Sequence, residues 1–498
     1  MKASLELHTQ FQIDAVDDRI FGGFIEHLGR CVYQGVYEPD HPLSDANGLR
    51  ADLRDALKEL GVTVVRYPGG NFVSGYHWED GVGVAEARRT VRELAWQSIE
   101  PNWFGTDEFI QLCRSLNWQP MLAVNLGTGT PEEARNWVEY CNALTGTYFA
   151  DQRAKNGNEE PFDVPLWCLG NEMDGPWQLG HVPVDEYCNR AQMAAKMMTD
   201  CDPRVELVAC GSSGPQMPTF IEWDHRVMQR MGSRLANYIS LHRYVGNRNE
   251  DSADYLAISN AIDNQIESVD ATARAVAGQS RDRRRTYLCF DEWNVWYRAR
   301  TQTDRDGTGR VAPVLLDETY NYEDALVVAM FLMSFIRHAD AVKIANLAQL
   351  VNVIAPLKTN PEGILKQSTF HPFRMISSRK GGTALQQAIT CDTYASESYG
   401  TVTYLDSATI LEESTLKVFA LNRHLEEAMT LTVNCADRPI LEFTDGELLS
   451  HTNLQAENSW RNASEITPAS LKDIKLDAGK AHVDLPPQSF AAVSFQLG

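Results

Sequence analysis

The sequence predicts an α/β fold, a (β/α)8 TIM barrel followed by a C-terminal antiparallel β-sandwich of jelly-roll-like form. Between about residues 20 and 346, eight short β-rich runs alternate with segments whose apolar residues recur at helical spacing, which is typical of repeated βα units. From about residue 385 the chain changes to short alternating segments separated by turn residues, which is typical of a sandwich. With 498 residues the chain is long enough for both domains.

The helical segments of the barrel region carry start and stop signals. Gly61 follows a run of leucines spaced along one helical face, and it is placed to cap the C-terminus of that helix. Thr130 is expected to cap the N-terminus of a later helix that has Pro131 in its first turn. The eight predicted strands are Phe21–Ile25, Val62–Tyr67, Met121–Val124, Leu166–Gly170, Val205–Ala209, Tyr238–Leu241, Tyr287–Phe290 and Val342–Ala345.

The two ends of the chain are predicted to form one domain. A last barrel helix is expected to end at Gly381 and Gly382, before the alternating C-terminal segments. The opening segment also alternates, so we expect it to pair with the sandwich. The predicted domains are an N-terminal strand segment over residues 1–18, the barrel over 19–380 and the sandwich over 381–498. The polar segment 298–310, after the seventh strand, is predicted to be a mobile loop over the barrel mouth.

Composition excludes several classes of partner. The formal charge of −22, from 45 basic and 67 acidic residues, argues against nucleic acid or an anionic membrane as a partner. No window approaches about 20 uninterrupted apolar residues, and the opening segment lacks the apolar core of a signal peptide, so we expect a cytoplasmic protein. The ten cysteines form no CxxC pair and are expected to be reduced. No HExxH or Walker A motif is present, so no metal or cofactor is predicted.

The predicted strand ends carry the candidate active site, because the C-terminal ends of barrel strands converge on one face. Glu172 follows Asn171 at the end of strand four, and Glu292 follows Asp291 at the end of strand seven. These strands lie across the barrel mouth from each other. Two facing carboxyl groups, one protonated and one ionised, are what glycoside hydrolysis requires. The other polar residues at strand ends are Glu26, His27, Arg66, Asn71, Asn125, Ser212, Ser213, His242, Tyr244, Asn346 and Gln349.

Each of these residues has a simpler interpretation. A single glutamate after a strand is often only a first-turn residue that the helix dipole favours, although two such pairs on strands four and seven weaken that reading. Arg66 is open to a purely structural ion pair, and His242 to the role of a core histidine. Tryptophans in the loops, such as Trp96 and Trp177, serve packing as often as they stack on sugars.

The sequence resembles the α-L-arabinofuranosidases of glycoside hydrolase family 51. The resemblance covers the whole chain and rests on the segments FGGFIEHLGRCVYQGVYEP, VRYPGGNFVSGYHWEDGVG, WQSIEPNWFGTDEF, CLGNEMDGPWQLGH, DEWNVWY and LAQLVNVIAP. It implies that Glu172 is the general acid/base and Glu292 the nucleophile. It further implies sugar contacts by Glu26, Asn71, Asn171, Tyr244 and Gln349, a pocket entrance shaped by Trp96 and Trp177, and support of the carboxylates by Arg66 and His242.

The resemblance also implies a reaction and a substrate. A retaining, exo-acting enzyme would remove terminal non-reducing α-L-arabinofuranosyl residues from arabinan or arabinoxylan oligosaccharides by double displacement, without a cofactor. A homo-oligomer, a hexamer in the family, is expected, and the sandwich is expected to supply no catalytic group. A β-xylosidase or an endoglucanase of the same clan remains an alternative. A non-catalytic carbohydrate-binding protein on a degenerate barrel would be expected to have lost one of the two glutamates, and both are present.

Overall fold

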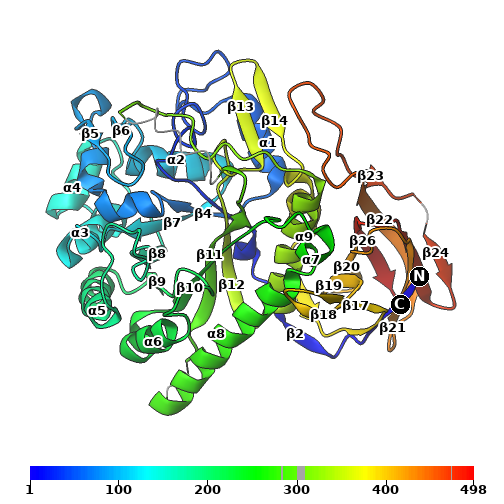
Figure 1. The fold of residues 1–498 in the computed structure, drawn as a ribbon. Helices are drawn as coiled ribbons and strands as arrows, with labels where there is room; N and C mark the ends of the chain where they lie inside the picture. Colours follow the sequence, from blue (N-terminus) through cyan, green and yellow to red (C-terminus); the bar gives the residue numbers. More distant parts are fainter. Residues whose placement is uncertain (282–283, 300–308, 473) are drawn as a thin grey trace.

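Eight parallel strands close into a barrel at the centre of the larger domain (Figure 1). The computed structural model describes the whole chain except residues 282–283, 300–308 and 473. The closed order is β10-β11-β12-β3-β4-β7-β8-β9, so the predicted (β/α)8 barrel is confirmed. Its strands are β3 (Gly22–Phe24), β4 (Val64–Tyr67), β7 (Gln119–Val124), β8 (Leu166–Leu169), β9 (Glu206–Ala209), β10 (Tyr238–Val245), β11 (Tyr287–Val295) and β12 (Val342–Ala348).

Helices surround the barrel, and their ends follow local chemistry. Gly61 has a φ of +81° after the first helix, and the Thr130 hydroxyl accepts a hydrogen bond from the backbone N–H of Glu133 at 3.1 Å. The last helix ends at Ser377 rather than at the glycines that were expected to end it. The described helices are α1 (Ala51–Leu60), α2 (Thr106–Leu116), α3 (Pro131–Asn142), α4 (Tyr148–Lys155), α5 (Val184–Cys201), α6 (Glu222–Leu235), α7 (Ser252–Tyr255), α8 (Ser259–Ser280), α9 (Tyr322–Arg337) and α10 (Phe370–Ser377).

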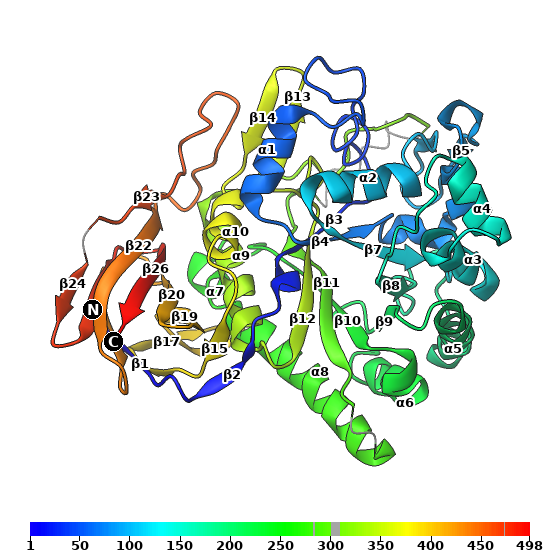
Figure 2. The same ribbon diagram turned by 180° about the vertical axis from the view of Figure 1, so that it is seen from behind.

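Two sheets form the second domain, and both chain termini lie on it (Figure 2). Their strand pairs are antiparallel, as predicted, except that β1 runs parallel to β21. One sheet has the order β2-β15-β19-β20-β26-β22-β23 and the other β16-β1-β21-β25-β24. The N-terminal strands β1 and β2 are therefore part of these sheets, while the predicted domain boundaries stay predictions. The strands include β1 (Lys2–Leu7), β2 (Gln12–Ala15), β15 (Thr383–Leu385), β16 (Ala388–Thr390), β19 (Leu405–Glu412), β20 (Thr415–Asn422), β21 (Met429–Cys435), β22 (Ile440–Ser450), β23 (Ala469–Ser470), β24 (Lys475–Asp477), β25 (Lys480–Leu485) and β26 (Ser489–Leu497).

The helix α9 joins the two domains through one continuous core. It contacts β11 of the barrel on one side and β19 of the sandwich on another. Its side chains from Tyr322 to Ile336 are buried, which explains why its sequence is apolar around the whole helix rather than along one stripe. No described helix is both long enough and apolar enough to span a bilayer, and all ten cysteines are free thiols.

Strands β10 and β11 extend further than their apolar runs predicted. Parallel pairing continues past a bulge between Ser240 and His242 and reaches the pair Val245 and Val295. His242 and Glu292 are themselves paired across the two strands. These polar residues therefore lie inside strands rather than after them, because backbone pairing continues where the apolar pattern stops. The rigid sheet thus carries the candidate residues of β10 and β11 directly.

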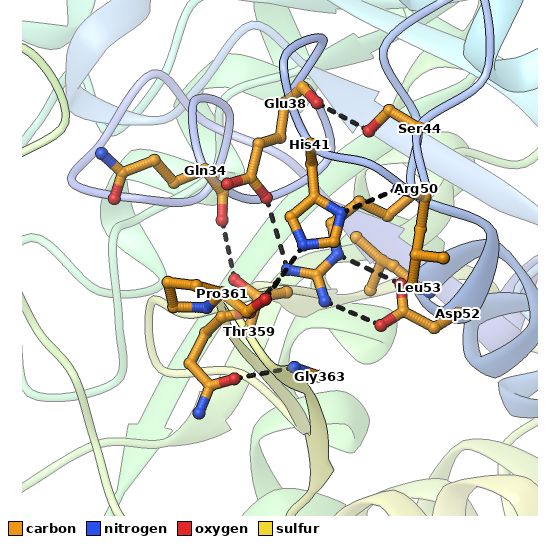
Figure 3. A network of polar contacts seen from close by, with 12 residues as sticks. Gln34, Glu38, His41, Ser44, Arg50, Asp52, Leu53, Thr359, Pro361 and Gly363 are labelled. Carbon is orange, nitrogen blue, oxygen red and sulfur yellow. Dashed lines mark hydrogen bonds and ion pairs between the residues drawn. The ribbon is translucent and has the colours of Figure 1, made fainter.

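The long segment after β3 is anchored to a hairpin that follows β12 (Figure 3). This hairpin consists of β13 (Leu357–Asn360) and β14 (Gly363–Lys366). The buried guanidinium of Arg50 donates to the carbonyl oxygen of Asn360 at 2.7 Å and to the Asp52 carboxylate at 2.7 Å. The buried Arg50 guanidinium therefore holds the segment after β3 against the β13–β14 hairpin at the barrel mouth.

Candidate active site

Glu172 and Glu292 meet at the C-terminal end of the barrel. Glu292 lies within β11, and Glu172 lies shortly after β8, where Gly170 and Glu172 have φ angles of +88° and +44°. These left-handed conformations turn the chain sharply at the strand exit. One carboxylate oxygen of each glutamate and one ring nitrogen of His242 all lie within 4.8 Å of one another.

His242 lies between the two glutamates. Its Nδ1 is 3.0 Å from Oε1 of Glu172 and 3.6 Å from Oε2 of Glu292, and its Nε2 is 3.4 Å from the Asp291 carboxylate. Burial by itself would lower the pKa of His242, but the charges of Glu292 and Asp291 raise that pKa well above its ordinary value. The raised pKa favours the protonated ring, and the ring contacts the carboxyl groups of Glu172, Glu292 and Asp291, so His242 is not an isolated core histidine.

Arg66 contacts the same cluster of side chains from the interior of the barrel. Its fully buried guanidinium donates to Glu292 Oε1 at 2.7 Å and to Asn171 Oδ1 at 2.7 Å, and its Nε is 3.5 Å from Asp291. Burial by itself raises the pKa of Asp291, but Arg66 and His242 bring that pKa below its ordinary value. The sequence predicts Asp291 at the end of strand seven but indicates no role for it. The available signal was a carboxylate directly before Glu292 in an otherwise apolar strand.

The environment of Glu172 favours its protonated form. Burial is the main cause that raises its pKa, and the negative charge of Glu292 adds to it. The hydrogen bond with His242 acts in the opposite direction, as does the bond that Trp177 Nε1 donates to Glu172 Oε2 at 2.6 Å. The net result is a raised pKa. The two facing carboxyl groups therefore differ in their surroundings, since Glu292 receives a hydrogen bond from Arg66.

Glu26 forms a second buried carboxyl site beside this pair. It accepts hydrogen bonds from the backbone N–H of Phe72 and from Trp96 Nε1, both at 3.0 Å, and from Gln349 Nε2 at 3.2 Å. Burial, with the charge of Glu292 as a further cause, raises the pKa of Glu26 to about 7. Glu26 is thus held in one orientation by three donors.

A cavity of about 670 Å³ opens above these groups. Tyr244 donates its hydroxyl proton to Glu292 Oε2 at 2.9 Å from the cavity wall. A Cβ on Gly70 would lie 2.8 Å from Glu292 Oε1, so the backbone approaches the carboxylate more closely than any side chain would allow. Arg66 and Asn171 lie beneath the wall. The predicted residues that line the cavity are Glu26, Asn71, Trp96, Glu172, Trp177, His242, Tyr244, Glu292 and Gln349.

Glu172, His242 and Glu292 together offer the donor types of a metal site, so the expectation that no metal is bound stays a prediction. The predicted loop at residues 298–310 falls mostly on residues 300–308, which lie outside the described part of the chain. Arg243, Arg248 and Tyr399 also line the cavity, at an end that no sequence pattern predicted. No sequence signal joins Tyr399, from the sandwich, to barrel residues.

Comparison with known proteins gives consistent matches over the whole chain. Residues 56–256 match the family model described as alpha-L-arabinofuranosidase 1 domain, and residues 291–489 match the alpha-L-arabinofuranosidase C-terminal domain. An intracellular exo-alpha-(1->5)-L-arabinofuranosidase 1 of Bacillus subtilis is 43% identical, over 94% of each chain. An exo-alpha-(1->6)-L-arabinofuranosidase of Bifidobacterium longum is 39% identical, over 99% of this chain and 97% of that one.

A solved structure gives the same result for the fold. A family 51 alpha-L-arabinofuranosidase from Bifidobacterium longum superposes with a TM-score of 0.94 at 38% identity, covering 99% of each chain. Two carboxyl groups brought together at the C-terminal ends of strands four and seven of a barrel form the arrangement that a glycoside hydrolase needs. The sequence identities and the coverage of the relatives also establish the family. The chain belongs to the α-L-arabinofuranosidases of glycoside hydrolase family 51.

Proposed function

We propose that this chain removes terminal non-reducing α-L-arabinofuranosyl groups from oligosaccharides, with retention of configuration at the anomeric carbon. The observation that carries the proposal is the closeness of the two carboxyl groups, since one oxygen of Glu172 and one oxygen of Glu292 lie within 4.8 Å of each other. Retaining glycosidases hold their carboxyl groups about 5 to 5.5 Å apart, whereas inverting enzymes need about 6.5 to 9.5 Å to admit a water molecule. The short separation favours a nucleophile over a general base for the second carboxylate.

The proposed roles follow from the different surroundings of the two glutamates. Glu292 is the nucleophile, because hydrogen bonds from Arg66 and Tyr244 fix the orientation of its carboxyl group. Glu172 is the general acid, because burial and the charge of Glu292 raise its pKa and keep its proton in place. His242 contacts both glutamates and is a positioning residue, because its ring holds the two side chains in place and reduces the repulsion between them.

The reaction proceeds in two displacements. Glu292 attacks the anomeric carbon, the bond to the leaving oxygen breaks, and Glu172 transfers its proton to that oxygen. The resulting ester removes the charge of Glu292, which lowers the pKa of Glu172. The ionised Glu172 then takes a proton from a water molecule, whose oxygen displaces Glu292 and releases arabinose. Each step inverts the anomeric carbon, so the two together retain it.

Buried polar atoms around the pair are suited to sugar hydroxyls. Within the described chain, Nδ2 of Asn171 and Oε1 of Gln349 are buried without a hydrogen-bond partner, although the other amide atom of each is bonded. A sugar hydroxyl would satisfy both atoms, which otherwise cost free energy. We therefore propose Glu26, Asn71, Asn171, Tyr244 and Gln349 as contacts of the arabinofuranosyl ring, with Trp96 and Trp177 at the entrance.

The natural substrate is proposed to be an arabinan or arabinoxylan oligosaccharide. The named relatives are exo-acting on (1->5) and on (1->6) linkages, so their names support exo action without fixing one linkage. The Bacillus subtilis relative is named as an intracellular enzyme, which supports a cytoplasmic location for this protein. A homo-oligomer, with a hexamer as the state expected for the family, is part of the same proposal.

A panel of aryl glycosides tests the proposed activity. We expect rapid hydrolysis of 4-nitrophenyl α-L-arabinofuranoside and much slower hydrolysis of the 4-nitrophenyl β-xyloside and β-glucoside. A preference for either of the other two would replace the proposed function by another activity of a retaining glycosidase. With a linear arabinan oligomer, the first products should be arabinose and a chain one unit shorter. Internal fragments at early times would contradict exo action.

A further inference from the structure

The cavity extends beyond the glutamates to a second end that the proposed reaction does not use. We call this part the arginine end, and it is lined by Arg243, Arg248, Tyr255, Ile258 and Tyr399. Cavities of about 300 to 1,000 Å³ enclose most of a drug-sized ligand. At about 670 Å³, this cavity has room for one sugar at the glutamates and for part of the glycan that carries it.

Arg243 lies between His242 and Tyr244 on β10, and its side chain therefore points away from the glutamates. Successive side chains of a strand point to opposite faces, so His242 and Tyr244 face the glutamates while Arg243 faces α8. There Arg243 Nη1 donates to Gln265 Oε1 at 3.0 Å, and Gln265 Nε2 in turn donates to the His242 carbonyl at 3.1 Å. The guanidinium is thus held in place beside the active strand.

The charge of Arg243 is not compensated by the described part of the chain. No described carboxylate lies within salt-bridge distance of it, and its Nε is buried without a hydrogen-bond partner. Burial lowers the pKa of Arg243 to about 10, so the group remains a cation at neutral pH. By contrast, Arg337 pairs with both Asp263 and Asp406. A buried, unpaired guanidinium is costly unless a ligand completes it.

A second arginine and two tyrosines face the same space. Arg248 lines the cavity and likewise has no described carboxylate within salt-bridge distance. Unpaired arginines are notable in a chain of 67 acidic and 45 basic residues. Tyr255, from α7, and Tyr399, from the sandwich, supply flat rings, which stack on the apolar faces of sugars.

Tyr399 is held in place across the domain boundary. It lies in the hairpin of β17 (Thr393–Ser396) and β18 (Gly400–Thr403), whose backbone N–H at Ser398 donates to Asp254 at 2.9 Å. The hydroxyl of Tyr394 donates to the Ala253 carbonyl at 2.9 Å. These contacts fix the hairpin on α7, so the sandwich contributes to the cavity wall without contacting the two glutamates through any hydrogen bond of the described residues.

We propose that the arginine end is a subsite for a carboxylate-bearing sugar, a uronosyl unit of the glycan from which the arabinofuranosyl group is removed. The carboxylate would accept hydrogen bonds from Arg243 and Arg248, while the sugar ring lies against Tyr255 and Tyr399. Arginine suits this role because its planar fork matches the two oxygens of a carboxylate. This inference rests on the proposed function, since it concerns the leaving part of the same substrate.

A matched pair of substrates tests the subsite. One is an arabinofuranosylated oligosaccharide that contains a uronosyl unit, and the other is the same oligosaccharide after its carboxyl group is reduced to an alcohol. We expect kcat/KM to be about ten-fold or more higher for the acidic form, as one charge-assisted hydrogen bond provides. A ratio of one or below in the native enzyme would overturn the proposal, since the net negative chain would then only repel the acid.

Variants locate the effect within the cavity. Arg243→Gln should bring the acidic-to-reduced ratio close to one, and Arg248→Gln, at an exposed position that folding tolerates, should lower the ratio by a smaller factor. Arg230→Gln is the matched control, because Arg230 pairs with Asp185 on the outer surface and should leave the ratio unchanged. A native ratio that neither cavity variant lowers would overturn the assignment.

Two further measurements distinguish a failure of the subsite proposal from a failure of the proposed function. Hexuronate should inhibit hydrolysis of 4-nitrophenyl α-L-arabinofuranoside more strongly than the neutral hexose does. Stronger inhibition by a hexose 6-phosphate than by the hexuronate would overturn the choice of a carboxylate. If the aryl arabinofuranoside is not hydrolysed at all, the proposed function fails. If it is hydrolysed and the acidic-to-reduced ratio is one, only the subsite fails.

Discussion

The two ends of the cavity differ in whether their cationic side chains have carboxylate partners. At the catalytic end Arg66 and His242 are in contact with Glu292, Asp291 or Glu172, so each cation has a carboxylate partner. At the arginine end, within the described residues, Arg243 has an amide partner and no carboxylate. Strand β10 contributes residues to both ends, because His242 and Arg243 point to opposite faces of it.

This difference separates a preorganised reaction centre from a recognition site. Paired charges hold the reacting groups in one geometry before substrate arrives, and the reaction then needs little reorganisation. An unpaired charge gains its partner only when a ligand supplies one. The catalytic end should therefore fail when one member of its network is removed, whereas the arginine end should change selectivity.

The largest expected effect is the loss of the nucleophile. Glu292→Ala removes the atom that forms the glycosyl-enzyme and takes from Arg66 the nearer of its two carboxylate partners. We expect kcat to fall by about 10⁴-fold or more on every substrate, including aryl arabinofuranosides with good leaving groups. Steady-state kinetics measures this. Glu267→Ala, at an exposed position of α8, is the matched control, and equal losses in the two variants would mean that the assignment is wrong.

A smaller and substrate-dependent effect is expected at Glu172. Glu172→Ala should lose about 10² to 10⁴ in rate on oligosaccharides, whose leaving group needs a proton. Formation of the glycosyl-enzyme from 4-nitrophenyl α-L-arabinofuranoside should remain, and its breakdown should be slow. Added azide needs no general base, so it should accelerate turnover. Pre-steady-state release of nitrophenol measures the burst, and the absence of both burst and azide rescue would contradict the assigned role.

The smallest expected effect is a shift in the pH profile. Activity should fall as pH rises through the raised pKa of Glu172, because the general acid then loses its proton. Trp177 donates a hydrogen bond that lowers this pKa, so Trp177→Phe should move the alkaline limb of kcat/KM to higher pH. Trp103→Phe, outside the cavity, should leave the limb in place. A limb that moves to lower pH in Trp177→Phe would contradict the assignment of that limb to Glu172.

The sequence predicted the catalytic end better than the arginine end, for a physical reason. Glu172 and Glu292 each follow a short apolar run of sequence, and the convergence of barrel strand ends predicts from that local pattern that they lie close together. The length of β10 was underestimated, because backbone pairing continues through His242 and Tyr244 where the apolar pattern stops. The support that Asp291 gives to Arg66 and His242 depends on distances across the barrel that no local pattern records.

The arginine end was not predicted, because its parts come from distant segments. Arg243 lies on a strand, Tyr255 on α7 and Tyr399 on a hairpin of the sandwich. The sequence indicated a second domain there, but not which of its loops contacts the barrel. Contacts between domains depend on how two folded surfaces fit together, and the periodicity of neither segment carries that information.

The stereochemistry of transfer tests the central claim most directly. The native enzyme is incubated with 4-nitrophenyl α-L-arabinofuranoside in the presence of methanol, and proton NMR identifies the anomer of the methyl glycoside that forms first. Two displacements, with Glu292 as nucleophile, predict methyl α-L-arabinofuranoside. The methyl β-L-arabinofuranoside would show a single displacement and would contradict the assignment of Glu292 as a nucleophile.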